Sequence, residues 1–413
     1  MPLVRPFAAL RPAPGRAADV IAPPYDVVTT DEARARAAGR PWSFLHVSKP
    51  EIDLAPGTDP YSPAAYAKAA ENLARMLHTG VLVRDPAPAY YVYRVASGDH
   101  VQTGLVAAAS VTAYEANRIR RHEHTRPDKE DDRVRHMQAL NAQTGPVLVV
   151  YPPAPEIDAL LADAARGAPD TDAALDDGSR HSIWPIHDAD RSARLSALFD
   201  AVPALYIADG HHRSAAASRV AAARRAAHPR DTGDASHEWF LTVAFPHHQL
   251  RILDYNRVVR DLGGLSLDAF LERLREKFTI AVSDTAVRPA RHGEFGLYAR
   301  GRWHRLRLRT ELAEVADPAQ HLDVSLLTDH VLAPILGIGD LRTDARIDFI
   351  GGGRGLAELE RRVDSGTMAA AFALYPTRME DLMAVADANE VMPPKSTWFD
   401  PKLADGLVSH VLD

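Results

Sequence analysis

The middle of this chain is organised around the stretch Tyr206-Ile207-Ala208-Asp209-Gly210-His211-His212-Arg213-Ser214-Ala215-Ala216-Ala217. The apolar run 204–208 predicts a short buried strand. Gly210 permits a tight turn, because glycine adopts either sign of φ without a steric cost. The alanine- and arginine-rich segment 214–227 predicts a helix. The stretch therefore predicts a strand, an acidic turn with two histidines, and a helix.

A helix that begins beside Asp-Gly-His-His-Arg can bind an anion, because its first amides point outward and carry partial positive charge. Arg213 could add a bidentate contact to a phosphate group. The predicted phosphate-binding residues of this stretch are Gly210, His211, Arg213 and Ser214. Asp209 and His212 are predicted to act in catalysis, and Asp209 also as a metal ligand. The alternative is an ordinary helix start with surface histidines.

Composition limits the functions that this chain can have. The 413 residues are 46% hydrophobic and 25% charged, as in ordinary globular proteins, and the length predicts two or three domains. The net charge of −7 argues against a general nucleic-acid surface. With no cysteine in the chain, disulfides, thiolate metal sites and cysteine nucleophiles are excluded.

No membrane or export function is expected. The first residues, Met1-Pro2-Leu3-Val4-Arg5-Pro6, lack the long apolar core of a secretion signal. No apolar stretch of about 18 residues is present, so no membrane span is expected. The sequence therefore predicts a cytoplasmic protein.

A second chemically dense segment precedes the central stretch, at His122-Glu123-His124-Thr125-Arg126-Pro127. Pro127 disfavours helix at the residue before it, so 122–126 should be a loop, followed by a helix over 129–141. Glu123 is predicted to be a general base beside cations that bind phosphate. The cations are Arg126 and Arg133, and the predicted substrate-binding residues are His122, His124 and Thr125. A solvated charged loop is the alternative, and the spacing of His122 and His124 does not match a His-Glu-x-x-His metal site.

The C-terminal tail carries a third candidate segment, Met392-Pro393-Pro394-Lys395-Ser396-Thr397-Trp398-Phe399. Adjacent prolines hold it extended. Lys395 is predicted to bind phosphate, and Ser396 and Thr397 to bind substrate, after the tail has folded back to bring Lys395 near Arg213. The alternative is a tail anchored by its two aromatic residues. The triple glycine at 351–353 resembles a phosphate-binding loop only loosely, because it lacks the lysine ending and the spacing of the known fingerprints.

The element pattern predicts a mixed α+β protein. Three regions are expected: an N-terminal α+β region over 1–110, a phosphate-binding region over 111–262, and a C-terminal α+β region over 263–413 whose tail returns to the site. Within the first region, the apolar segment Ser43-Phe44-Leu45-His46-Val47 predicts a short strand.

Four stretches together resemble the family known as domain of unknown function 1015. They are Ala22-Pro23-Pro24-Tyr25-Asp26, the loop 122–127, the turn 209–213 and the tail 392–399. The stretches span nearly the whole chain. The family label implies no reaction.

The turn 209–213 is also similar to the phosphate-binding box of the ParB/sulfiredoxin-like superfamily, to which free-serine kinases belong. The resemblance implies a ParB/sulfiredoxin-like central region. It implies that the turn holds the phosphate of a donor, and that an upstream glutamate, best matched by Glu123, takes the hydroxyl proton of serine. The superfamily also contains DNA-partition proteins and a sulfinic acid reductase, so fold alone does not decide the function.

The leading functional hypothesis is a phosphotransferase with Mg²⁺ that uses ATP, ADP or pyrophosphate and acts on a small hydroxyl compound, above all free L-serine. One alternative is a phosphomonoester hydrolase on the same site, and another is a non-enzymatic ParB-like nucleotide-binding module. The expected partner is a small-molecule substrate, with no nucleic acid and no membrane. The sequence leaves the oligomeric state open, a homodimer included.

Overall fold

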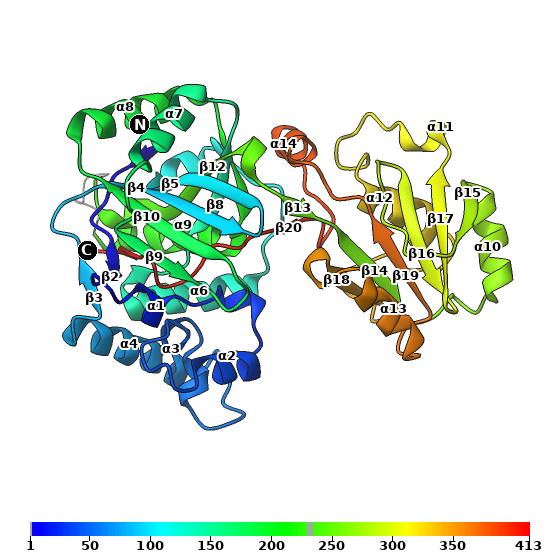
Figure 1. Ribbon diagram of the computed structural model, residues 1–413, viewed down its shortest axis with the longest axis horizontal. Helices are drawn as coiled ribbons and strands as arrows, with labels where there is room; N and C mark the ends of the chain where they lie inside the picture. Colours follow the sequence, from blue (N-terminus) through cyan, green and yellow to red (C-terminus); the bar gives the residue numbers. More distant parts are fainter. Residues whose placement is uncertain (1, 229–233) are drawn as a thin grey trace. The chain divides into compact units, whose positions relative to one another are not determined.

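The computed structural model describes residues 2–228 and 234–413, and the chain divides into two compact units (Figure 1). Unit 1 comprises Met1–Leu250 together with Pro401–Asp413, and unit 2 comprises Arg251–Asp400. The last residues of the chain therefore belong to the same unit as the N-terminal half. Both units contain helices and sheets, so the expected α+β class is confirmed.

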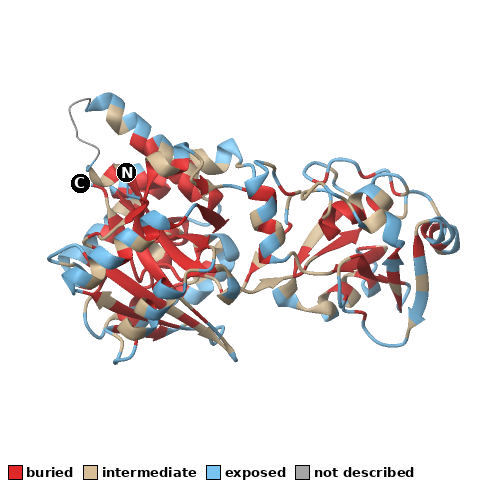
Figure 2. Cartoon of the chain, turned by 90° about the horizontal axis from the view of Figure 1, so that it is seen from above, coloured by how far each residue is buried: buried red, intermediate tan, exposed pale blue. Residues whose placement is uncertain are grey.

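Unit 1 is built on one mixed sheet with the strand order β6-β11-β8-β12-β5-β4-β10-β9. The short strand β1 also pairs with β5 but is not part of this linear order. The strands are β1 (Val4–Arg5), β4 (Tyr90–Ser97), β5 (His100–Ser110), β6 (Ile119–Arg120), β8 (Val147–Tyr151), β9 (Thr171–Ala174), β10 (Arg180–Ile186), β11 (Leu205–Asp209) and β12 (Trp239–Pro246). Most of their apolar side chains are buried (Figure 2), although Val101 of β5 is 49% exposed. This sheet provides the core of unit 1.

Two strand pairs of this sheet are parallel, β6 with β11 and β8 with β12. In the first pair Leu205 lies opposite Ile119, and Tyr206 opposite Arg120. Parallel strands end at the same edge of a sheet. The loop that follows β6 and the turn that follows β11 are therefore brought to one edge, although His122 and His211 in these two segments are 89 residues apart in the sequence.

Helices cover the sheet of unit 1. They are α1 (Ala17–Val20), α2 (Thr30–Ala37), α3 (Leu45–Ser48), α4 (Pro63–His78), α5 (Val111–Glu115), α6 (Pro127–Leu140), α7 (Pro155–Ala164), α8 (Ala189–Ala201) and α9 (His211–Ala227). On α9 the buried residues Ala216, Ala217, Val220 and Ala221 recur with helical spacing and join the core of the sheet. Short pairs complete the unit: β2 (Leu10–Pro12) with β3 (Leu82–Arg84), and β7 (Ala142–Gln143) with β21 (His410–Val411).

The expected strand at Ser43–Val47 is wrong, because this segment forms the one-turn helix α3. Phe44 is completely buried, in a small core that also contains Leu73 and Met76 of α4. A short apolar run reports burial but cannot distinguish a strand from a buried helical turn. Packing against α4 decided the conformation here.

Unit 2 has its own six-stranded antiparallel sheet with the order β15-β17-β16-β19-β14-β18. Its strands are β14 (Tyr255–Val259), β15 (Phe278–Ser283), β16 (Glu294–Ala299), β17 (Arg302–Leu308), β18 (Ile347–Gly351) and β19 (Ala370–Leu374), with the separate pair β13 (Ile252–Leu253) and β20 (Trp398–Phe399). Its helices are α10 (Leu267–Arg275), α11 (Thr310–Ala313), α12 (Asp323–Leu327), α13 (Leu356–Asp364) and α14 (Met379–Asp387).

The expected region boundaries at residues 110 and 262 differ from the boundaries of the units. Strand β5, which ends at Ser110, pairs with β12 from Leu105 to Ser110, so the hydrogen bonds of one sheet join the expected first and second regions. The second unit begins at Arg251 and ends at Asp400 rather than at the end of the chain. Sheet pairing between distant segments has set these boundaries.

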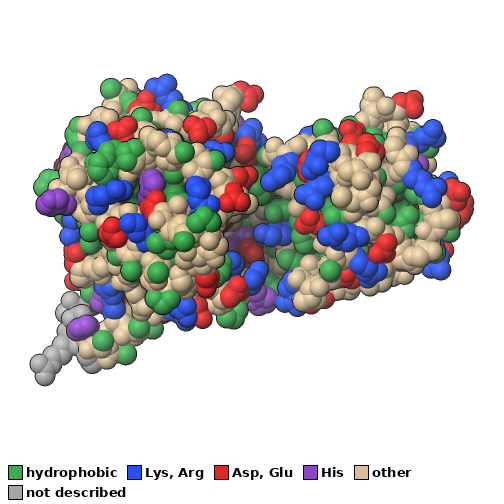
Figure 3. Space-filling model, turned by 90° about the horizontal axis from the view of Figure 1, so that it is seen from below, with side chains coloured by type: hydrophobic (Ala, Val, Ile, Leu, Met, Phe, Trp, Pro, Cys, Tyr) green, Lys and Arg blue, Asp and Glu red, His purple; other side chains and the backbone are tan. Residues whose placement is uncertain are grey.

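Acidic and basic side chains are interspersed over the face of the molecule shown in Figure 3. Such mixing is typical of a solvated protein surface. No helix in the described part of the chain has the length and apolar character needed to cross a bilayer.

Candidate active site

The central turn has the predicted form of strand, glycine and helix. Strand β11 ends at Asp209, Gly210 caps the next helix with φ 101° and ψ 27°, and α9 begins at His211. This φ is left-handed, which glycine alone adopts readily. A Cβ at this position would lie 3.1 Å from Nε of Arg213 and 3.3 Å from Cα of Val147. Gly210 therefore allows the first turn of α9 to pack closely against the end of the sheet.

Two cations surround the Asp209 carboxylate. Nζ of Lys402 lies 3.1 Å from its Oδ2, and Nη2 of Arg213 lies 3.6 Å from the same oxygen. Burial alone would raise the pKa of Asp209, but the attraction of Lys402 and Arg213 outweighs it and holds this pKa well below its usual range. The carboxylate is ionised at neutral pH and has two cations beside it.

Arg213 is held from several sides. Its side chain is only 8% exposed, and Nη1 donates to the carbonyl of Pro146. Burial alone would lower the pKa of Arg213, but the charges of Asp209 and Asp26 raise it by more. The pKa is therefore higher than usual, and the guanidinium stays charged. Gly145 leaves room for it, since a Cβ there would lie 3.2 Å from Cδ of Arg213. The cation is thus fixed in place before any ligand binds.

The loop that follows β6 reaches the start of α9, as the parallel pairing requires. The rings of His122 and His211 contact each other edge to face, with 4.4 Å between centroids and 85° between planes. Oε2 of Glu123 lies 3.7 Å from Nδ1 of His211. The amide of Arg126 donates to Nε2 of His212, the next residue of α9, at 3.0 Å. The structure therefore brings together two segments that sequence analysis had singled out separately.

The histidines of this cluster are neutral at physiological pH. Burial lowers the pKa of His122 to about 4. Burial, together with the nearby His122, lowers the pKa of His211 well below its usual value. Burial also lowers the pKa of His212. Neutral imidazoles can accept hydrogen bonds or bind metal ions.

The remaining predicted residues of the loop lie at different depths. His124 is exposed, and Thr125 donates to Oε1 of Glu130. Arg126 is exposed and pairs with Asp128 at 2.8 Å. Arg133 is buried, pairs with Asp132 at 2.6 Å and stacks over the ring of Tyr25 at 4.0 Å.

Ser214, also a predicted phosphate ligand, is fully buried in α9 and donates to the carbonyl of His211 at 3.0 Å. The Ser214 hydroxyl therefore donates its hydrogen bond within the helix and not to a ligand.

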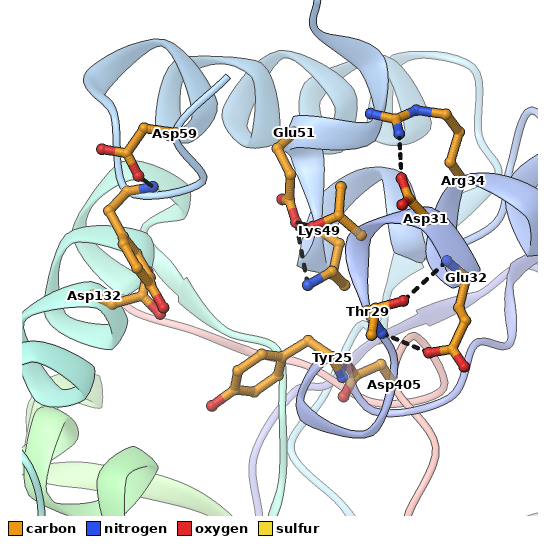
Figure 4. A network of polar contacts seen from close by, with 12 residues as sticks. Tyr25, Thr29, Asp31, Glu32, Arg34, Lys49, Glu51, Asp59, Asp132 and Asp405 are labelled. Carbon is orange, nitrogen blue, oxygen red and sulfur yellow. Dashed lines mark hydrogen bonds and ion pairs between the residues drawn. The ribbon is translucent and has the colours of Figure 1, made fainter. Parts of the chain in front are cut away.

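A buried carboxyl that sequence analysis did not select lies beside this cluster. Asp405 is 2% exposed, and its Oδ2 accepts from the amide of Tyr25 at 3.2 Å; Figure 4 shows the two residues together. Burial raises the pKa of Asp405 to about 7, against the opposing attraction of Arg213. A small cavity of about 10 Å³, enough for about one water molecule, is lined by Tyr25, Arg133, His136, Arg213 and Asp405 among others.

The predicted tail residues Lys395, Ser396 and Thr397 belong to unit 2. Lys395 has a left-handed φ of 59°, and its carbonyl accepts from Nη1 of the buried Arg257 at 2.9 Å. Ser396 donates to the carbonyl of Pro393 at 2.6 Å. The role of these residues in ligand binding stays a prediction.

Sequence analysis missed Lys402, Asp405 and Tyr25 as members of the cluster. Lys402 and Asp405 follow the tail segment that had been selected, and Tyr25 lies in the Pro-Pro-Tyr-Asp segment used only for the family resemblance. One signal could have found Asp405: it is a single acid within the apolar run Leu403-Ala404-Asp405-Gly406-Leu407-Val408. A lone acid among buried apolar residues needs a local reason to be there.

Several solved structures resemble this chain remotely. Free serine kinase in complex with AMP matches at 12% identity and a TM-score of 0.37, over 71% of this chain and 86% of that chain. SbnI with C-terminal truncation from Staphylococcus aureus matches at 12% identity and a TM-score of 0.37, over 73% of this chain and 85% of that chain. A conserved hypothetical protein from Pyrococcus furiosus matches at 12% identity and a TM-score of 0.36, over 73% of this chain and 94% of that chain. At these scores we transfer no residue role from these structures.

No curated protein matches this chain. A family model described as "Protein of unknown function (DUF1015)" matches residues 4–325, well over half of the chain. The match includes the Pro-Pro-Tyr-Asp segment, the loop after β6 and the turn after β11. The family resemblance expected from these stretches is thus confirmed, and the chain belongs to the DUF1015 family of proteins of unknown function.

Proposed function

We propose that this protein is a phosphotransferase that moves a phosphoryl group from a nucleotide or pyrophosphate to the hydroxyl of a small molecule, with free L-serine as the first acceptor to test. The observation that carries the proposal is the position of Glu123, whose carboxylate lies 3.7 Å from His211 at the N-terminus of α9. A candidate base thus stands directly beside a candidate phosphate site.

The start of α9 suits the phosphate of a donor. α9 is 17 residues long, and the amides of its first turn have no partner within the helix. Arg213 and Lys402 together carry two positive charges at this helix start, and the carboxylates of Asp209 and Asp26 lie close enough to act on both. Phosphoryl transfer depends mainly on positioning and on charge stabilisation, both of which such a site supplies.

Glu123 suits the role of the base. Its side chain is 46% exposed, so an acceptor hydroxyl can reach it from solvent. The neighbouring His211 is neutral and buried, so it can orient the carboxylate without neutralising it.

Asp209 is the proposed ligand of Mg²⁺. It is ionised, and its side chain is 30% exposed, so an ion could bind it directly or through water. With Mg²⁺ on Asp209, Lys402 could offer its charge to the phosphate oxygens, while Arg213 would keep its fixed position beside the turn.

Hydrolysis is the second candidate function. The exposure of Glu123 also admits water, which the same carboxylate could activate in place of an acceptor hydroxyl. A third candidate, a nucleotide-binding module without catalysis, uses the same helix start but no base.

Phosphorus NMR separates these functions. The protein is incubated with Mg²⁺, with ATP, ADP or pyrophosphate, and with a panel of hydroxy amino acids. A new phosphomonoester signal supports transfer and identifies donor and acceptor together. Free phosphate without a phosphorylated acceptor indicates a hydrolase, and spectra without any change indicate a binding module.

The first test of the mechanism is Glu123→Gln. We expect turnover to fall by about 1,000-fold or more, because amide oxygen is a far weaker base than carboxylate. The matched control is Glu71→Gln on α4, an exposed glutamate that pairs with Lys68 on the surface and should leave turnover unchanged. Near-normal turnover in Glu123→Gln, with circular dichroism like that of the wild type, would remove Glu123 from the base role.

A further inference from the structure

Three side chains with metal-binding atoms meet at the edge where β6 and β11 end. They are His122, Glu123 and His211, and one ligand atom from each lies within 4.8 Å of the other two. Two come from the loop after β6 and one from the first turn of α9. Tetrahedral Zn–N bonds of about 2.0–2.1 Å place two ligand atoms about 3.4 Å apart. Small side-chain movements would therefore close the observed cluster around an ion.

His122 provides a second, independent observation. Its side chain is buried, with the residue only 2% exposed, and its Nδ1 has no hydrogen-bond partner. The ring does bond to the backbone of Ile207, so that bond must use Nε2. A buried polar atom left without a partner costs about 1–3 kcal/mol. The lone pair on Nδ1 therefore needs a ligand that the protein itself does not supply.

The orientation of His122 is that of a metal-bound histidine. Histidine ligands commonly donate one ring N–H to a backbone carbonyl, which fixes the tautomer and leaves the other nitrogen for the ion. The bond to Ile207 does this for His122. We infer that His122, Glu123 and His211 form a site for one divalent transition-metal ion of the zinc class.

The donor set fits this class of ion. Two imidazoles and one carboxylate are a known zinc ligand set, which leaves the fourth position to water or substrate. Hard ions such as Mg²⁺ prefer sites made wholly of oxygen. Glu123 is the exposed member of the cluster, with 46% of its side chain exposed, and provides the path by which an ion enters.

Ion binding has one local cost. The amide of His122 contacts Nε2 of His211 at 3.5 Å, at the long end of hydrogen-bond distances. Binding of an ion by Nδ1 of His211 would place the ring proton on Nε2, and this long contact would be given up. A metal–nitrogen bond is far stronger than the contact it replaces.

This site does not rest on the proposed phosphotransferase function. An ion would engage the Glu123 carboxylate that we propose as the base, so the ion-bound and ion-free proteins are two states of one cluster. Binding is therefore measured without nucleotide or acceptor, and a negative result leaves the NMR test of phosphoryl transfer unaffected.

The test is equilibrium dialysis of the untagged protein against micromolar Zn²⁺ and, in parallel, Co²⁺. We expect one ion per chain, and for Co²⁺ the visible absorption of a four-coordinate complex. In Glu123→Gln the affinity should fall by about 10-fold or more, because a charged ligand is lost. This exposed position lets the variant fold normally, which circular dichroism verifies.

The chain has 19 histidines, so the control must separate this cluster from surface binding. His124→Ala changes an exposed histidine next to Glu123 and should bind Zn²⁺ as the wild type does. His122→Asn should abolish stoichiometric binding. The inference is overturned if the wild type binds no stoichiometric ion, if Glu123→Gln binds as tightly as the wild type, or if His124→Ala weakens binding as much as Glu123→Gln.

Discussion

Each unit contains a strand that runs through glycine into a helix, and the two turns are packed in opposite ways. In unit 1, Gly210 joins β11 to α9, and the atoms nearest to it belong to the guanidinium of Arg213. In unit 2, β18 ends at Gly351, two more glycines follow before α13, and the atoms nearest to Gly351 belong to the indole of Trp398. A Cβ on Gly351 would lie 2.5 Å from Cε3 of that ring.

The comparison shows that glycine before a helix can serve two purposes. In unit 2, Gly351 and Gly353 lie against the Trp398 ring and Gly352 lies against Asp254 and Leu253, so the triple glycine has a packing role. In unit 1 the glycine lies among Asp209, Arg213 and Lys402, and the helix start is surrounded by charge. A strand–glycine–helix pattern therefore indicates an anion site only when charged side chains accompany it.

The largest effect that would test this contrast concerns Asp405, the buried acid beside the turn of unit 1. Its pKa is raised to about 7 by burial, so the folded protein keeps a proton that the unfolded chain releases near pH 4. Unfolded chains then bind fewer protons than folded ones between about pH 4 and 7, and stability falls as pH rises through this window.

Asp405→Asn removes this loss. The difference in the free energy of unfolding between variant and wild type should grow from about pH 4 to about pH 7, by up to about 4 kcal/mol. Above about pH 7 this difference should stay constant. The difference in the free energy of unfolding is measured by urea unfolding at several pH values, with hydrogen exchange of α9 as the probe. The exposed Asp176→Asn, a surface partner of Arg36, should follow the wild-type curve. A constant offset between Asp405→Asn and the wild type would contradict the raised pKa.

The next largest effect concerns Lys402, whose ammonium supplies half of the positive charge beside Asp209. We expect Lys402→Met to lower phosphotransferase turnover by about 100-fold, the usual range for loss of one charge-stabilising donor. Turnover is measured with the donor and acceptor found by NMR.

Lys68→Met on α4, where the lysine pairs with a surface glutamate, is the matched control and should keep full turnover. If Lys402→Met also keeps full turnover, the charge around the unit 1 turn has no role in transfer.

The smallest effects compare the two glycines directly. Gly351→Ala should destabilise unit 2 by about 1–3 kcal/mol, because the new methyl group overlaps the Trp398 ring. Gly210→Ala should destabilise unit 1 by about 1–2 kcal/mol, because alanine is strained at a φ of 101°. Hydrogen exchange resolved by peptide reports each unit separately. If Gly351→Ala leaves the stability of unit 2 unchanged, the added methyl group does not clash with the Trp398 indole.

Much of the site could be predicted because the signals are local. The apolar run before Asp209, the glycine and the alanine-rich segment each favour one conformation within a few residues, and all three appear as expected in β11 and α9. Pro127 likewise predicted the loop before α6. Glu123 was selected for its chemistry, and its distance of 3.7 Å from His211 makes that choice testable.

Other features could not be predicted because they depend on distant segments. Lys402 contacts Asp209 across 193 residues, and no local pattern marks that pairing. The segment at Ser43–Val47 is helical because of its packing on α4. The units are bounded at 250 and 401 because the chain leaves one sheet to form another and then returns.

The sequence by itself therefore determined the α+β class, the family and the strand–turn–helix at 205–227, since short-range sterics, propensity and motif chemistry act within each segment. Only the tertiary structure decided which charges surround that turn. The parallel pairing of β6 with β11 carries Glu123 and His122 to the start of α9, and the return of the chain at Pro401 carries Lys402 and Asp405 there. Such contacts arise from sheet register and chain return, which no short stretch of sequence encodes.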